Sequence, residues 1–116
     1  MLVAAPPLLG QHLFIDGKVG AMPNLKCARW LLAAIACLLE MRMLGQPRAY
    51  RQGEAVVAFV VIAESHIFLH LYPAPAMSYV DIFSCRPFDR LRAINFVSQS
   101  LRMTEVTSRQ INRGTE

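Results

Sequence analysis

The chain has 116 residues, of which 54% are hydrophobic and 17% are charged, so it is long enough for one small domain and too apolar for intrinsic disorder. The net charge is +4, but the Lys and Arg residues are scattered along the chain, which argues against a nucleic-acid-binding protein. The longest apolar helical stretch, from Trp30 to Leu39, is too short to cross a bilayer, so we expect a cytoplasmic protein without a membrane partner.

The first half of the chain predicts an arm, a strand and a helix. Residues 1–10 hold paired prolines and form a loose arm, which lacks the basic segment that opens a signal peptide. His12 to Asp16 alternates weakly and predicts a strand. Asn24 is a good cap for a helix near residues 24–40. Residues 41–51 contain a Gly-Gln-Pro breaker and predict a short strand and a loop.

The second half predicts three central strands, a helix and a last strand. Ala55 to Ala63 is a continuous apolar run rich in β-branched residues, which favours a strand buried on both faces. Ile67 to Tyr72 and Tyr79 to Cys85 predict two further strands whose side chains alternate between two faces. Pro87 begins a helix, and Met103 to Ile111 predicts the last strand. The apolar stripe of that helix is Phe88, Leu91, Ile94, Val97 and Leu101.

These elements follow the order β-α-β-β-β-β-α-β. An antiparallel sheet with helices on one face fits this order. We therefore predict an α+β fold, a two-layer sandwich, formed by a single domain over residues 11–116.

The cysteines and acids give weak signals on their own. Cys27, Cys37 and Cys85 are not spaced as metal ligands and do not suggest a disulfide framework, and we expect no metal. Because Cys27 and Cys37 sit in an apolar helical stretch, we expect both to be buried. Asp16 and Asp81 could act as an acid and a base only if the fold brings them together.

The informative feature is the polar triplet Glu64-Ser65-His66, which interrupts a long apolar stretch. A tight turn facing water is the simple explanation. His70 follows inside a strand, and Cys85 comes just before a predicted helix N-terminus, where the helix dipole favours a thiolate. A core histidine and a buried cysteine are the simple explanations here. Ser, His and Cys side chains on adjacent strands could still converge on one pocket.

Taken together, these motifs resemble a known family. VVIAESHI at residues 60–67, with His70, and VDIFSC at residues 80–85 are similar to the prokaryotic S-adenosylmethionine decarboxylase proenzymes. The opening strand matches through Gln11-His12-Leu13 and Asp16. The resemblance extends over about residues 10–113 and implies that family's fold, reaction and processing.

The resemblance implies self-cleavage between Glu64 and Ser65. The Ser65 hydroxyl would attack the Glu64 carbonyl, and elimination and hydrolysis would leave a pyruvoyl group derived from Ser65. This group forms a Schiff base with the substrate amine and accepts electrons when carbon dioxide leaves. The family's processing histidine corresponds to His70, and its general acid corresponds to Cys85. The family also forms dimers, which implies a homodimer of cleaved protomers.

Three segments depart from the family pattern. Val57 replaces a serine in the strand before the cut, followed by Ala58 where the family has glycine. Ala74 replaces the glutamate that holds the ribose hydroxyls. Arg86 replaces the usual glycine after the cysteine.

Three functions are compatible with these residues. Two are enzymes that act on a small-molecule substrate, and one is a protein that binds a partner. The first is a pyruvoyl-dependent decarboxylase of S-adenosylmethionine that serves spermidine synthesis. The second, suggested by Ala74, is a decarboxylase of ornithine or arginine. The third, suggested by Val57, is an unprocessed homologue that binds a partner subunit.

Overall fold

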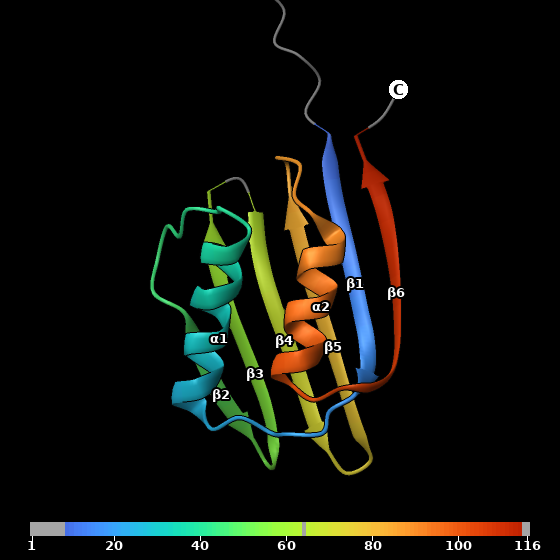
Figure 1. Ribbon diagram of the computed structural model, residues 1–116. Coiled ribbons are helices and arrows are strands. Elements are labelled where there is room, and N and C mark those ends of the chain that lie inside the picture. Colours follow the sequence, from blue (N-terminus) through green and yellow to red (C-terminus); the bar gives the residue numbers. More distant parts are fainter. Residues whose placement is uncertain (1–8, 64, 115–116) are drawn as a thin grey trace, which may run out of the picture.

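The structure, a computed structural model, describes residues 9–63 and 65–114, which form a six-stranded antiparallel sheet and two helices (Figure 1). Along the chain the elements are β1 (Gly10–Lys18), α1 (Leu25–Leu38), β2 (Arg48–Gln52), β3 (Ala55–Ile62), β4 (Ser65–Pro73), β5 (Ala76–Ser84), α2 (Arg90–Ser100) and β6 (Thr104–Arg113). The strands lie in the order β2-β3-β4-β5-β1-β6. The predicted order of elements and the α+β sandwich are confirmed. The predicted arm lies outside the described residues as far as residue 8.

Both helices cover the same face of the sheet, and the core lies between these two layers (Figure 1). In β3, Val56, Val60 and Ile62 point into the core, as the alternation of a strand requires. Helix α1 turns five buried residues toward the sheet: Ala28, Leu31, Leu32, Ile35 and Ala36. Each large aliphatic side chain buried in this way contributes about 1.5–3 kcal/mol to folding.

Helix α1 begins where the sequence predicts. The side-chain oxygen of Asn24 accepts a hydrogen bond from the Cys27 N–H at 2.7 Å, which satisfies one of the free donors of the first turn. The thiols of Cys27 and Cys37 are exposed, so their predicted burial is wrong. This helix is apolar almost all round, and the spacing of apolar residues alone does not show which side faces the sheet.

Helix α2 differs from its prediction in start and in orientation. It begins at Arg90, with Asp89 as its cap. Its buried residues are Ala93 and Val97. Leu91, which we expected on the apolar stripe, is 64% exposed. Two residues correspond to about 200° around a helix, so Leu91 points away when Ala93 faces the sheet.

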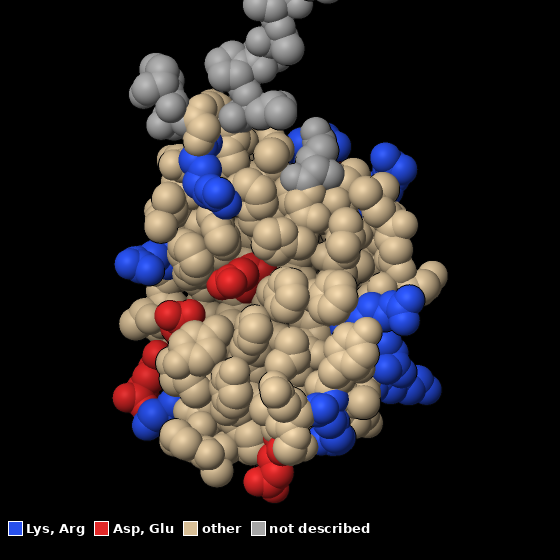
Figure 2. Space-filling view, turned by 180° about the vertical axis from the view of Figure 1, so that it is seen from behind, with Lys and Arg blue, Asp and Glu red and all other residues tan. Residues whose placement is uncertain are grey.

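The other face of the sheet carries no helix, and we call it the uncovered face (Figure 2). Val57 and Phe59 of β3 are only half-buried there and Val61 is 47% exposed, so the predicted burial of this strand on both faces is wrong within the chain. Figure 2 shows a largely uncharged surface with two acidic groups near its middle. The strand register puts ten rings on it: His12, Phe14, Tyr50, Phe59, His66, Phe68, His70, Tyr72, Tyr79 and Phe83.

Candidate active site

Two of the predicted site residues, Ser65 and Cys85, lie side by side at one end of the sheet. Ser65 is the first residue of β4 and stands opposite Ser84, the last residue of β5. The main-chain N–H of Cys85 donates a hydrogen bond to Ser65 Oγ at 3.0 Å. The side chain of Cys85 is half-buried. The fold therefore brings this serine and this cysteine together, whereas Glu64 lies outside the described residues.

His70 does not join this pair within one chain. It lies five residues along β4 from Ser65, which corresponds to about 17 Å at the rise of a strand. Because five is an odd number, Ser65 points to the helix-covered side and His70 to the uncovered face. There His70 stands opposite Val57 of β3 and Tyr79 of β5, and its ring stacks on Phe68 with centroids 5.3 Å apart.

Two further histidines, His12 and His66, lie together on the uncovered face and are not among the predicted site residues. His12 of β1 and His66 of β4 both stand opposite Phe83 of β5. Their rings meet edge to face with centroids 6.3 Å apart. His66 directly follows Ser65 in the sequence, but the alternation along β4 points its ring to the uncovered face, away from the Ser65 side chain. His12 could not have been placed without the pairing of β1 with β5.

The environment of His12 disfavours the charged form of its ring. Burial is the main cause that lowers the pKa of His12 below its ordinary 6.5, and His66 and Arg113 act in the same direction, against an opposing effect of Asp81. The Nε2 atom of His12 is buried and has no hydrogen-bond partner among the residues that the structure describes. A neutral imidazole nitrogen of this kind can accept or donate a proton.

The fold brings Asp16 and Asp81 close together, which is the condition for them to act as an acid and a base. Asp16 stands opposite Tyr79, and Asp81 lies two residues further along β5, so the two carboxyl groups are diagonal neighbours. Burial, and then the charge of Asp81, raise the pKa of Asp16, while Arg109 opposes this effect. These acids line a shallow pocket on the uncovered face together with His70.

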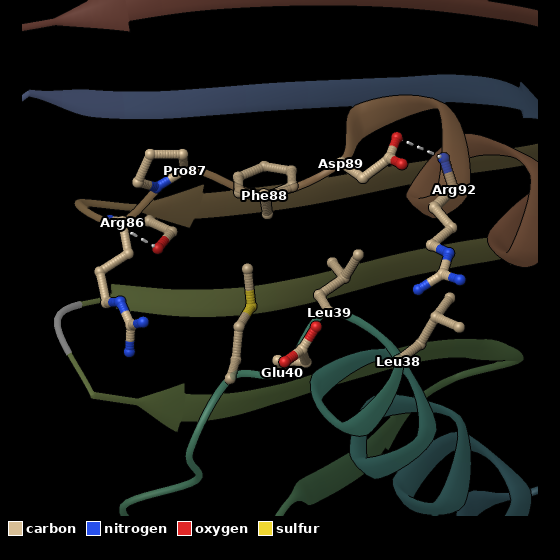
Figure 3. A pocket seen from close by; sticks show the side chains of 10 residues that line it. Leu38, Leu39, Glu40, Arg86, Pro87, Phe88, Asp89 and Arg92 are labelled. Carbon is tan, nitrogen blue, oxygen red and sulfur yellow. Dashed lines mark hydrogen bonds between the residues drawn. The ribbon is translucent and has the colours of Figure 1, made fainter.

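A second hollow lies on the helix-covered side, next to the Ser65–Cys85 pair. It is an open cavity of about 240 Å³ between residues 38–41 and residues 86–89, with Ser84 and Arg92 also in its wall. Figure 3 shows Arg86 and Arg92 toward opposite ends of this cavity, with apolar side chains between them. The segment that follows Cys85 therefore forms one wall of the hollow.

The helix N-terminus that we predicted directly after Cys85 is not there. Helix α2 begins at Arg90, and residues 86–89 separate it from the thiol. Because the helix dipole acts mainly within the first turn, the predicted help from this dipole to Cys85 is not supported.

Residues 9–63 and 65–114 show neither a metal site nor a membrane-spanning helix. They contain no group of three or more His, Cys, Asp or Glu side chains placed to hold a metal ion. In the same ranges no helix combines the length and the apolar character that a membrane span requires.

Comparison with known families defines the class of this protein. The family model of S-adenosylmethionine decarboxylase matches residues 12–114, which is nearly the whole chain. The chain therefore belongs to the S-adenosylmethionine decarboxylase family, a family of carboxy-lyases made as proenzymes, as the resemblance indicated.

Particular relatives support this membership. The S-adenosylmethionine decarboxylase proenzyme of Saccharolobus islandicus is 25% identical over 98% of this chain and 96% of its own length. The proenzyme of Thermoanaerobacter pseudethanolicus is 34% identical over 91% of this chain and 89% of its own. The crystal structure of the adenosylmethionine decarboxylase from Aquifex aeolicus superposes with a TM-score of 0.80 at 20% identity, over 96% of this chain and 95% of that one. This last likeness supports the fold.

Proposed function

We propose that the chain cuts itself between Glu64 and Ser65 and then acts in the cytoplasm as a pyruvoyl-dependent decarboxylase of S-adenosylmethionine for spermidine synthesis. The observation that carries this proposal is the 3.0 Å hydrogen bond from the Cys85 N–H to Ser65 Oγ. It sets the proposed nucleophile beside the proposed acid. The proenzyme relatives support the same reaction.

The proposed cut proceeds through the hydroxyl of Ser65. Its Oγ attacks the carbonyl carbon of Glu64, the peptide C–N bond breaks, and an ester joins the two residues while Ser65 gains a free amino group. A base then removes the Cα proton of Ser65, the Cβ–Oγ bond breaks, and Oγ leaves as part of the Glu64 carboxylate. Water replaces the nitrogen, which departs as ammonia, and residue 65 becomes a pyruvoyl group.

The residues present fit this group and its chemistry. A pyruvoyl carbonyl supplies an electron sink for the electrons released when carbon dioxide leaves a substrate. Ser65 begins a strand and is half-buried, as is Cys85, whose main chain it contacts. Cys85 is the proposed acid that returns a proton to the substrate carbon.

His70 is the proposed base for the cut, and its position favours action on a second copy of the chain. Within one chain it lies about 17 Å along β4 from Ser65 and on the other face. The uncovered face is rich in rings, largely uncharged and free of helices, which supports a homodimer joined through this face. Because the base removes the Cα proton of Ser65, whereas Oγ points to the helix-covered side, His70 of one copy would approach residue 65 of the other from the uncovered face.

Mixing two inactive variants tests this arrangement. Ser65→Ala lacks the nucleophile and His70→Ala lacks the base, so neither is expected to complete the cut alone. After mixing under conditions that exchange subunits, the His70→Ala chain should be cut, because its Ser65 meets His70 from the other variant. Mass spectrometry shows which chain is cut. Complete cutting by His70→Ala alone would refute the role of His70, and no cutting of the mixture would refute action between copies.

Ala74 favours a second candidate substrate. Where the family holds the ribose hydroxyls with a glutamate, this chain offers a methyl group, and charge-assisted hydrogen bonds of about 1.5–3 kcal/mol are lost. A plain amino acid such as ornithine or arginine needs no ribose contact. Carbon dioxide release from S-adenosylmethionine, ornithine and arginine, measured side by side with cut protein, decides between them. Release only from an amino acid would overturn the proposed substrate.

Val57 supports a third candidate, an uncut homologue that binds a partner subunit. It stands directly opposite His70, where the family pattern has a serine hydroxyl. The intact mass of the purified protein tests this. The proposed cut leaves 64 residues and 116 − 64 = 52 residues, whereas Ser65→Ala should remain whole. A wild-type chain that stays whole after long incubation would favour the partner-binding role.

A further inference from the structure

The segment that follows β5 is held by side-chain oxygens. Three of its main-chain N–H groups donate to them, and Pro87 has no N–H to offer. The pairs, donor first, are Cys85 with Ser65 at 3.0 Å, Arg86 with Ser84 at 3.0 Å and Phe88 with Gln11 at 3.1 Å. The position of the Cys85 thiol therefore depends on these three acceptors.

Gln11 makes the most extensive of these contacts. Its Oε1 accepts the N–H of Phe88 at 3.1 Å, and its Nε2 donates to the carbonyl of the same residue at 3.0 Å. The Nε2 atom also donates to Gln110 Oε1 of β6 at 3.0 Å. The carboxamide thus grips the main chain of one residue with both ends, while Gln110 fixes its orientation. Through this contact, β1 holds a segment 77 residues away in the sequence.

The proposed cut changes this set of acceptors. In the reaction written above, Oγ of Ser65 leaves with the carboxylate of residue 64, so the Cys85 N–H loses the acceptor that it has before the cut. The Ser84 contact is local, because it joins residues two apart and moves with the end of β5. Among the side-chain hydrogen bonds of the described residues, those of Gln11 then tie this segment to a strand distant in the sequence.

We infer that Gln11 is a positioning residue for Cys85 and that the cut enzyme depends on it more than the uncut chain does. It acts through the main chain of Phe88 and holds the segment from Cys85 to Phe88 against β1. This inference rests on the proposed role of Cys85 as the acid. The carboxamide itself needs no contact with the substrate.

Gln11→Met tests the inference in the cut enzyme, since it keeps a similar length and removes all three hydrogen bonds. Gln110→Met is the matched control, because it removes the outer link to Gln11 and a hydrogen bond to Asn112 but leaves both bonds between Gln11 and Phe88 in place. We expect kcat of Gln11→Met to fall about tenfold with KM within about twofold, the signature of a contact that matters in the transition state. The rate of the cut should change less than about threefold, since Ser65 Oγ still holds Cys85 at that stage. Gln110→Met should resemble the wild type.

Two results would overturn this inference. One is equal turnover in Gln11→Met and Gln110→Met. The other is a loss of cutting rate as large as the loss of kcat, because the dependence would then not arise from the cut. Both are distinct from a failure of the proposed function, which would appear as a wild-type chain that never cuts itself.

A labelling experiment tests the same contact without any catalysis. Ser65→Ala also lacks Oγ, so Gln11→Met in this background should speed iodoacetamide labelling of Cys85 about tenfold, and Gln110→Met should not. The exposed thiols of Cys27 and Cys37 serve as internal standards in the same peptide map. Equal labelling of Cys85 with and without Gln11→Met would refute the tether.

Discussion

Cys85 contributes two different groups to the proposed reaction. Its main-chain N–H holds Ser65 Oγ before the cut, and its thiol serves as the acid afterwards. Cys85→Ala keeps the N–H, so we expect the chain still to be cut. Turnover should fall at least about a hundredfold, the usual scale for loss of a general acid. Intact mass and carbon dioxide release report the two steps, and Cys27→Ala, an exposed position, is the control. Wild-type turnover in Cys85→Ala would refute the assignment.

Asp16 gives a prediction for the pH dependence of stability. Burial and then Asp81 raise its pKa above the ordinary 3.8. A group whose pKa is higher in the folded state stabilises the fold below its unfolded pKa, and this contribution is lost as the pH rises through the folded pKa. Asp16→Asn, made in the uncut Ser65→Ala chain, should therefore unfold at higher urea concentration than its parent at pH 7. This advantage should vanish at pH 3.

The control for this prediction is Asp89→Asn in the same chain. Asp89 is an exposed helix cap, and asparagine caps a helix about as well as aspartate does. We expect no comparable gain at pH 7 from this variant. If Asp16→Asn were less stable than its parent at pH 7, the carboxylate of Asp16 would be a favourable charge and the argument from burial would be wrong.

The sequence could propose which residues form the candidate site but not how far apart they lie. Ser65 and Cys85 lie side by side because β4 and β5 pair as a hairpin. The alternating pattern of both segments predicts two strands that could pair in this way. His70 appears close to Ser65 in the sequence, yet five residues of extended chain separate them in space. The tie from Gln11 to Phe88 joins residues 77 apart, and no local pattern encodes it.

The loop from β1 to α1 lies close against the main chain that follows α2. The N–H of Gly20 donates to the Leu101 carbonyl at 2.9 Å, and a Cβ at Gly20 would collide with the carbonyl oxygen of Arg102. Main-chain atoms cannot rotate away as a side chain does. Gly20→Ala should therefore lower the free energy of unfolding by about 1–3 kcal/mol.

Gly45→Ala is the matched control for this prediction. A Cβ at Gly45 would meet nothing within 4 Å, so the change should stay within about 0.5 kcal/mol. Urea unfolding of both variants, again in the uncut Ser65→Ala chain, provides the measurement. Equal stability of the two variants would contradict the predicted collision.

The elements themselves were largely predictable, because their signals are local. The Asn24 cap and the apolar run of β3 mark their elements without help from the rest of the fold. The faces of the helices were less predictable. In α1, Cys27 and Ala28 are both compatible with an apolar stripe, and only packing against the sheet selects Ala28 for burial.

For the whole molecule, the uncovered face predicts how copies associate. Val61 lies on this face and is 47% exposed, so Val61→Lys should leave the fold intact but oppose burial of the face in a dimer. Trp30, 64% exposed on helix α1, lies on the opposite side of the molecule, and Trp30→Lys is the control. Sedimentation velocity should show a dimer for the wild type and Trp30→Lys and a monomer for Val61→Lys. A dimer that is lost only in Trp30→Lys would place the interface on the helices.

The strand order has a consequence for the two fragments that the proposed cut would leave. The first would keep β1, β2 and β3, and the second β4, β5 and β6. Since β1 lies between β5 and β6, strands of the two fragments are interleaved in the sheet. Separating the fragments would break three sets of main-chain hydrogen bonds, those of β1 with β5, β1 with β6 and β3 with β4. Folding of the uncut chain is unimolecular, whereas refolding of the cut protein requires the two fragments to associate. We therefore expect the chain to fold before it is cut, and the cut protein to stay active only as long as its two fragments do not dissociate.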